Sequence, residues 1–218
     1  MKLIQKLKNI KIKICGIKNF TILNCCNELE VNYFGLMFYK KSPRYIEIEE
    51  AKSLIKDQKN KYSIPVGVFV NHKFEELIRI VNLLNLNYVQ LHGEESNEYI
   101  LNLKKKNDVK ILKVIKIENK NDLSNIQLFS EADFFLFDYK PKNSELPGGN
   151  AKSFDWTILK EKKIDKPWFI SGGLNKNNLN DLLNILNPYG IDISSGVEDL
   201  PGIKNEEKIK EIVEIINE

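Results

Sequence analysis

The sequence has few of the residues that bind metals or form disulfides. Among its 218 residues are three cysteines, Cys15, Cys25 and Cys26, and two histidines, His72 and His92. The cysteines are odd in number, lack CxxC spacing and have no histidine nearby, so neither a disulfide framework nor a zinc site is expected. A reducing cytosol suits such a chain best, and we expect a cytoplasmic protein.

Long apolar runs and blocks of like charge are also missing. Lysines interrupt the opening MKLIQKLKNIKIKIC, where a secretory signal needs an apolar stretch, and no window reaches the roughly 18 apolar residues of a membrane span. Lysine and arginine total 33 against 30 acidic residues, and the net charge of +3 is spread along the chain. That pattern argues against nucleic acid, so we expect neither a nucleic-acid nor a membrane partner.

What the sequence does contain is a regular alternation of short apolar runs and longer amphipathic ones. Eight runs read as strands: Lys11–Ile17, Tyr33–Tyr39, Ile64–Asn71, Tyr88–Gly93, Val109–Ile117, Phe134–Lys140, Pro167–Gly173 and Gly190–Gly196. Apolar residues at helical spacing occupy Phe74–Leu84, Asn177–Leu186 and Glu206–Ile216, and each connection is long enough for the crossover helix that parallel strands need. Eight such units predict an α/β fold, a single-domain TIM (β/α)8 barrel over residues 1–218 with residues 1–10 as a lead-in.

In such barrels the chemistry lies where the strands end, so the polar residues there are the candidates. They are Cys15, Arg44, Asn71, Gln90, His92, Asp138, the Ser171–Gly173 segment, Asp192 and the Ser194–Gly196 segment. They include no cluster of histidines or carboxylates, so we expect no metal. The last two strands end in glycine-containing loops, with Gly172 and Gly173 in one and Ser194, Ser195 and Gly196 in the other. Because barrels often bind phosphate at these two loops, they predict a phosphate site.

Each candidate side chain also has a plain structural interpretation. Cys15 could be a small buried hydrophobe, as Cys25 and Cys26 are expected to be within a helical stretch. Asp138 directly follows FFLF, and an aspartate that interrupts an apolar strand needs a partner or a task. His92 could simply hold a loop, and Arg44, which follows the turn-forming Pro43, could form a surface ion pair.

Eight motifs together resemble those of phosphoribosylanthranilate isomerases of tryptophan biosynthesis. They are KICGIKN, FGLMFYKKSPRYI, VGVFVN, VQLHGEE, FLFDYK, GGNAKSFDW, ISGGLNKNN and DISSGVEDLPGIK, in the family's order and approximate spacing from about Lys11 onward. The resemblance departs from the family pattern at Asn150 and Ala151, where a threonine and a glycine are usual. No motion of this loop is therefore inferred by analogy.

The resemblance implies a cofactor-free Amadori rearrangement of a phosphosugar, in which Cys15 is the general base and Asp138 the general acid. It also implies that Arg44 lies near the anthranilate end of the substrate and that the two glycine-containing loops hold the phosphate. Gln90 and His92 are further candidates for substrate binding. Gly16 is expected to leave room beside the thiol.

Other functions are weighed against this one. A related sugar isomerase of histidine biosynthesis would have an aspartate in place of Cys15, and metal-dependent epimerases need more histidine ligands than this chain has. A thiol hydrolase would need a histidine near Cys15. A barrel that only binds a phosphorylated ligand stays open. We expect a monomer by default, although a homodimer through loop contacts is compatible with the sequence.

Overall fold

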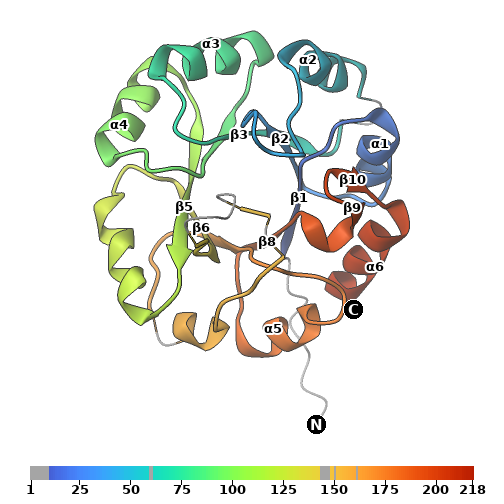
Figure 1. The fold of residues 1–218 in the computed structure, drawn as a ribbon, viewed down its shortest axis with the longest axis vertical. Helices are drawn as coiled ribbons and strands as arrows, with labels where there is room; N and C mark the ends of the chain where they lie inside the picture. Colours follow the sequence, from blue (N-terminus) through green and yellow to red (C-terminus); the bar gives the residue numbers. More distant parts are fainter. Residues whose placement is uncertain (1–9, 59–60, 143–147, 150, 161) are drawn as a thin grey trace.

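Eight parallel strands close into a barrel, which confirms the TIM-barrel prediction (Figure 1). The computed structural model describes residues 10–58, 61–142, 148–149, 151–160 and 162–218, so most of the lead-in and Asn150 lie outside the described residues. The strands are β1 (Lys11–Cys15), β2 (Tyr33–Met37), β3 (Ile64–Phe69), β4 (Tyr88–Leu91), β5 (Lys110–Ile117), β6 (Phe134–Tyr139), β7 (Trp168–Ile170) and β8 (Gly190–Ile193). A short hairpin of β9 (Glu198–Leu200) and β10 (Ile203–Lys204) follows β8.

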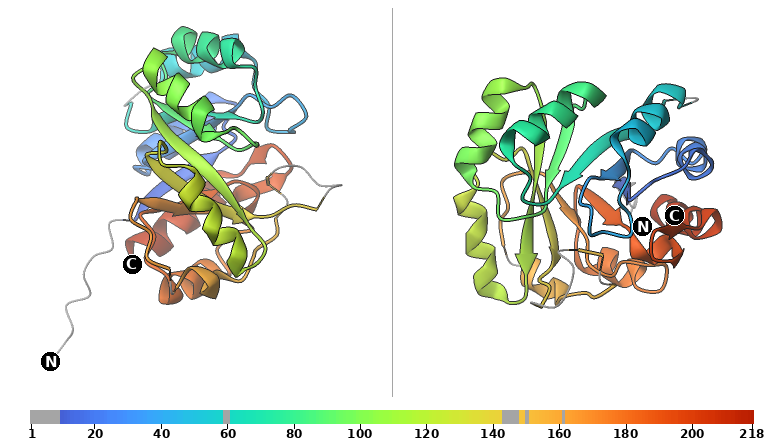
Figure 2. Two further views of the ribbon diagram at one scale, coloured as in Figure 1. Left: turned by 90° about the vertical axis from the view of Figure 1, so that its left-hand side faces the viewer. Right: turned by 45° about the horizontal axis from the view of Figure 1, so that its top comes forward.

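Helices surround the ring of strands (Figures 1 and 2). They are α1 (Phe20–Glu28), α2 (Ile48–Asp57), α3 (Phe74–Leu84), α4 (Asn97–Lys106), α5 (Leu179–Ile185) and α6 (Glu206–Asn217), with 3-10 helices η1 (Lys120–Leu128), η2 (Trp156–Leu159) and η3 (Ser195–Val197). The prediction of Phe74–Leu84 matches α3, whose buried residues recur at helical spacing. Side-chain caps start several helices; Ser96, for example, accepts a hydrogen bond from the Tyr99 amide at the start of α4.

Most of the predicted strands extend too far at their carboxyl ends. Strand β1 ends at Cys15 rather than Ile17, because Gly16 turns the chain with a φ of 86°. Strand β7 ends at Ile170 rather than Gly173, and Gly172 and Gly173 both have positive φ. A left-handed residue cannot continue the strand ladder, so these polar ends become the loops around the barrel mouth.

The crossovers on either side of β6 differ from the predicted α-helices. Within the described residues, the segment after β5 forms η1, and the segment after β6 contains only the short η2 before β7 begins. In η1 a single residue, Leu123, is buried, so little apolar contact drives a longer α-helix. The expected helix Asn177–Leu186 is present but shorter, as α5.

The barrel has two apolar layers. One fills its interior with inward-facing side chains: Tyr33, Val66, Leu112, Val114, Leu136 and Phe169. The other lies between the strands and the surrounding helices, and Ile12 and Ile14 of β1 belong to it. Because side chains alternate along a strand, Lys13 and Cys15 face the interior, which places the thiol at the inner rim of the barrel.

Candidate active site

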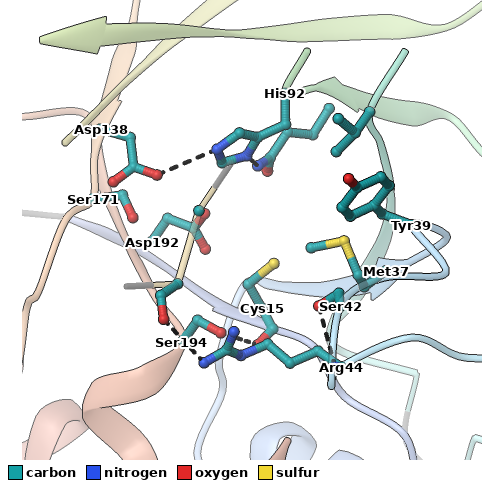
Figure 3. Close-up of a pocket in the computed structure, with 14 residues that line it drawn as sticks. Cys15, Met37, Tyr39, Ser42, Arg44, His92, Asp138, Ser171, Asp192 and Ser194 are labelled. Atoms are coloured by element: carbon teal, nitrogen blue, oxygen red, sulfur yellow. Dashed lines mark hydrogen bonds and ion pairs between the residues drawn. The ribbon is translucent and has the colours of Figure 1, made fainter. Parts of the chain in front are cut away.

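A pocket opens inside the rim at the carboxyl ends of the strands (Figure 3). Its lining brings together most of the predicted site residues from separate loops and strands: Cys15, Arg44, Gln90, His92, Asp138 and Ser194, with Met37, Tyr39, Ser42, Val70, Gly148, Gly149, Ser171 and Asp192. In Figure 3 the Cys15 sulfur and the Asp138 carboxyl group lie on opposite sides of this space. A thiol and a carboxyl group therefore line one pocket, as acid–base catalysis on a single substrate requires.

Cys15 is the last residue of β1, and the residue is 5% exposed. Burial raises the pKa of this thiol, while the nearby ammonium groups of Lys13 and Lys204 act in the opposite direction and the Asp192 carboxylate adds to the rise. The room beside the sulfur comes from Gly35 on β2, which pairs in register with Cys15. Gly16, the next residue, packs against Arg44, since a Cβ there would lie 2.9 Å from that side chain, and its expected role beside the thiol stays a prediction.

Replacing Gly35 with alanine is expected to reduce both stability and turnover. The added Cβ would lie 2.7 Å from the Cys15 sulfur and 3.0 Å from its Cα, so the strand or the thiol must move. Overpacking of this kind costs about 1–3 kcal/mol, and displacement of a reacting group lowers kcat by roughly tenfold or more. Thermal unfolding and steady-state kinetics measure the two effects.

Gly67→Ala is the matched control for this variant. Its Cβ would contact Phe69 in β3 and Leu86, which follows α3, and neither contact involves the thiol. Gly67→Ala should therefore lose stability with little change in kcat. A normal kcat in Gly35→Ala would show that the position of the sulfur is not set by this contact.

Asp138 is oriented by two neighbours near the end of β6. The amide of Tyr139 donates to Oδ1 at 2.8 Å, and His92 Nε2 lies 3.4 Å from Oδ2. Gly148 packs over this pair, since a Cβ there would approach the His92 ring at 2.8 Å. The carboxyl group is therefore fixed toward the pocket, with Gly148 packed beside it.

Gln90 and His92 form a linked pair on the adjoining wall of the pocket. The Gln90 amide nitrogen lies 3.1 Å from His92 Nδ1, and with Gln90 as donor His92 Nε2 carries the hydrogen that faces Asp138. Gln90 is 1% exposed, and its Oε1 has no hydrogen-bond partner within the described part of the chain. A buried acceptor of this kind can be satisfied by a donor on a bound ligand.

Arg44 is buried in an ion pair rather than lying on the surface. Its Nε and Nη2 donate to the two carboxylate oxygens of Glu198 at 2.9 and 2.8 Å, and Nη2 also reaches the Gly149 carbonyl at 3.5 Å. Burial alone would raise the pKa of Glu198, but the hydrogen bonds from Arg44 and the charge of Lys204 outweigh it and lower that pKa. The guanidinium is thus held rigidly at the pocket wall, where it can still face a ligand.

A second hollow adjoins the first at the glycine-containing loops. It is lined by Gly172, Gly173, Ser194 and Ser195, and it shares Asp138, Ser171, Asp192 and Ser194 with the main pocket. Gly196 does not line it; a Cβ there would collide with the Leu174 carbonyl, so this glycine allows the two loops to pack together. Four of the five predicted phosphate-loop residues therefore surround one small polar hollow.

Several site residues were not identified from the sequence. Lys13 donates to Asp192 at 2.8 Å beneath the pocket, and Lys204 donates to Glu198. The alternation of KIKIC could have placed Lys13 on the same face as Cys15, but its partner lies 179 positions away. Glu198 and Lys204 belong to the VEDLPGIK segment, where nothing local indicates burial.

Across the residues that the structure describes, no group of three or more histidines, cysteines or acidic residues lies together as a metal site. Among the described helices, none has both the length and the apolar character needed to cross a membrane. The fold and the pocket define a (β/α)8 barrel in which a thiol and a carboxyl group line one pocket at the strand ends.

Comparison with known proteins identifies the family. The family described as N-(5'phosphoribosyl)anthranilate (PRA) isomerase matches residues 12–215, so the chain belongs to that family, as its motifs predict. An N-(5'-phosphoribosyl)anthranilate isomerase from Rhizobium leguminosarum bv. trifolii (strain WSM2304) is 41% identical over 209 residues, covering 95% of this chain and 94% of the relative. The Thermoanaerobacter sp. (strain X514) isomerase is 40% identical over 205 residues, covering 94% and 97% of the two chains.

Solved structures agree with this assignment. Phosphoribosyl anthranilate isomerase from Thermotoga maritima superposes with a TM-score of 0.84 at 31% identity, covering 94% of this chain and 97% of that chain. A phosphoribosyl anthranilate isomerase in complex with reduced 1-(o-carboxyphenylamino)-1-deoxyribulose 5-phosphate gives a TM-score of 0.81 at 29% identity over the same shares. The Thermotoga maritima enzyme is described as dimeric.

Proposed function

We propose that this protein converts N-(5-phosphoribosyl)anthranilate to 1-(2-carboxyphenylamino)-1-deoxyribulose 5-phosphate by general acid–base catalysis. The observation that carries the proposal is the pocket that Cys15 and Asp138 both line, with the hollow of the two glycine-containing loops beside it. Strands β7 and β8 lie between β6 and β1 in the closed barrel. A sugar held by its phosphate at these two strands would therefore lie between the acid and the base.

The reaction needs a group that donates a proton to the substrate and a group that removes one from it. Asp138 would donate a proton to the furanose oxygen as the bond from C1 to that oxygen breaks, and the nitrogen lone pair then forms an iminium ion at C1. The iminium makes the hydrogen on C2 acidic, and the Cys15 thiolate would remove it. The electrons of the C2–H bond form the C1–C2 double bond and neutralise the nitrogen, and the resulting enol amine becomes the ketone by tautomerisation.

The other lining residues would orient the substrate. Arg44 is suited to the carboxylate of the anthranilate ring, because a guanidinium fixed by Glu198 keeps further N–H groups for a second anion. Gln90 and His92 lie on the wall beside Asp138, where the free Gln90 Oε1 could accept a hydrogen bond from the substrate. Gly172, Gly173, Ser194 and Ser195 would surround the phosphate, with Gly196 holding their loop in place.

The test is the fluorescence decay of freshly made N-(5-phosphoribosyl)anthranilate mixed with the purified protein and no added metal. Conversion changes the environment of the anthranilate ring, so an enzyme should produce a rapid decay above the uncatalysed rate. A folded protein that binds the product but produces no decay would favour the binding-only barrel. A protein that instead isomerises a different phosphosugar would point to a related isomerase of the same fold.

The oligomeric state is a separate proposal. We propose a monomer, as the sequence suggests, although the Thermotoga maritima relative is described as dimeric. Light scattering across a range of protein concentrations would decide, with a mass near 25.3 kDa expected for the monomer. The proposed site does not depend on the result, because all its residues come from one chain.

A further inference from the structure

The interior of the barrel contains a buried ion pair directly beneath the catalytic thiol. Lys13 and Asp192 are neighbours in the register of β1 and β8, and Lys13 Nζ lies 2.8 Å from Asp192 Oδ1. Lys13 is fully buried and Asp192 is 5% exposed, among interior residues that are otherwise mainly apolar. A buried ion pair is often no more stabilising than apolar side chains of the same volume, so its presence here calls for a role other than packing.

A second set of buried charges lies near the same thiol. Lys204 donates to Glu198 at 2.6 Å, and Glu198 in turn binds Arg44 through both carboxylate oxygens. Lys204 also donates to the carbonyl and the hydroxyl of Ser194 at 3.1 Å, and the Ser194 hydroxyl donates to the Cys15 carbonyl at 3.0 Å. The β9–β10 hairpin thus places an ammonium group close to the end of β1.

The charges in this cluster do not balance. Within the part of the chain that the structure describes, it contains three cations, Lys13, Arg44 and Lys204, and two carboxylates, Asp192 and Glu198, and each of the five residues is at most 9% exposed. One positive charge is therefore in excess in a place that water reaches poorly. Across the pocket, Asp138 and His92 contact each other. The group best placed to supply the missing negative charge is the thiol, which is itself buried among these charges.

We propose that Lys13 and Lys204 are positioning residues, and that their buried cluster supplies the positive charge which stabilises the thiolate of Cys15. The contacts of the thiol agree with this: both ammonium groups favour its ionised form and oppose the effect of burial. The proposal rests on the proposed role of Cys15 as the base, and it explains what opposes the rise in the thiol pKa that burial causes. A substrate carboxylate at Arg44 would also balance the charge, so the test uses the protein without ligand.

The experiment measures how fast iodoacetamide alkylates Cys15 between about pH 5 and 10, because only the thiolate reacts. Trypsin releases Cys15 in the peptide ICGIK, or in IMICGIK from Lys13→Met, and in both cases the peptide is separate from Cys25 and Cys26, so mass spectrometry follows Cys15 alone. Removing one cation in Lys13→Met or Lys204→Met should lower the rate at pH 7 by about tenfold, which corresponds to one pKa unit. Removing one anion in Glu198→Gln should raise the rate instead.

The opposite changes in alkylation rate, slower in the lysine variants and faster in Glu198→Gln, distinguish the proposal from a general loosening of the fold. Loosening would expose the thiol and speed alkylation in all three variants. Lys166→Met is the control, because Lys166 contacts carbonyl groups near the start of β6, at the far end of the barrel, and should leave the profile unchanged. If Lys13→Met does not fold, Lys204→Met tests the same expected decrease in alkylation rate with the Lys13–Asp192 pair intact.

The outcomes also separate this inference from the proposed function. Unchanged alkylation profiles in the lysine variants, or shifts in the same direction as in Glu198→Gln, would overturn the charge cluster and leave the proposed function standing. Profiles that shift as expected in a protein without isomerase activity would overturn the proposed function and leave the cluster standing.

Discussion

A Cys15→Ser enzyme is expected to lose at least about a hundredfold in kcat while KM changes little. Serine keeps the size and the position of the side chain, but its hydroxyl group forms the anion far less readily than a thiol does. The loss should therefore fall on proton removal from C2 and spare substrate binding. Steady-state kinetics with the anthranilate fluorescence assay measure both constants.

The pH profile gives this prediction a second readout. Because burial raises the pKa of the Cys15 thiol, wild-type kcat should increase as the pH rises from neutral and the thiolate becomes more populated. Cys15→Ser should lose that increase. Cys25→Ser is the matched control, since Cys25 lies half-buried in α1, where burial and nearby glutamates raise its thiol pKa to about 11. If Cys15→Ser kept the wild-type kcat, Cys15 would have only a packing role.

The barrel could be predicted from the sequence because each strand is identified by the apolar pattern of its own short run. Runs such as those around Val66 and Leu136 are apolar on both faces, as strands buried between a filled interior and a layer of helices must be. The ends of the strands were harder to predict. Residues such as Ser171 and Gly172 continue an apolar run in sequence, and only the positive φ of the glycine shows where the ladder stops.

The positions of the candidate site residues followed from one rule about strand ends, but their partners did not. Arg44 could be placed near the mouth from its position after β2, whereas its ion pair with Glu198 joins residues 154 positions apart. The same holds for Lys13, because lysine in a strand usually indicates a solvent-facing position. Which face of β1 is inside, and which residue of β8 lies opposite, depends on the register of the closed barrel.

The second large effect is expected for Asp138→Asn, which should reduce kcat about as much as Cys15→Ser while the protein stays folded and still binds product. Asparagine keeps an oxygen that can accept from the Tyr139 amide and a group that can face His92, so the local structure should persist. It has no carboxyl proton to give to the furanose oxygen, so ring opening should become limiting. Kinetics and product titration by fluorescence measure the two effects.

Asp133→Asn is the matched control, because Asp133 precedes the same strand and binds Lys104 at the opposite end of the barrel. That variant should lose stability but keep its kcat. The comparison separates the loss of the proton donor from the general effect of replacing an aspartate in or next to β6. If Asp138→Asn kept near-normal turnover, the proton would have to come from elsewhere in the pocket. His92 would then be the group to test, since it is the titratable side chain in direct contact with Asp138.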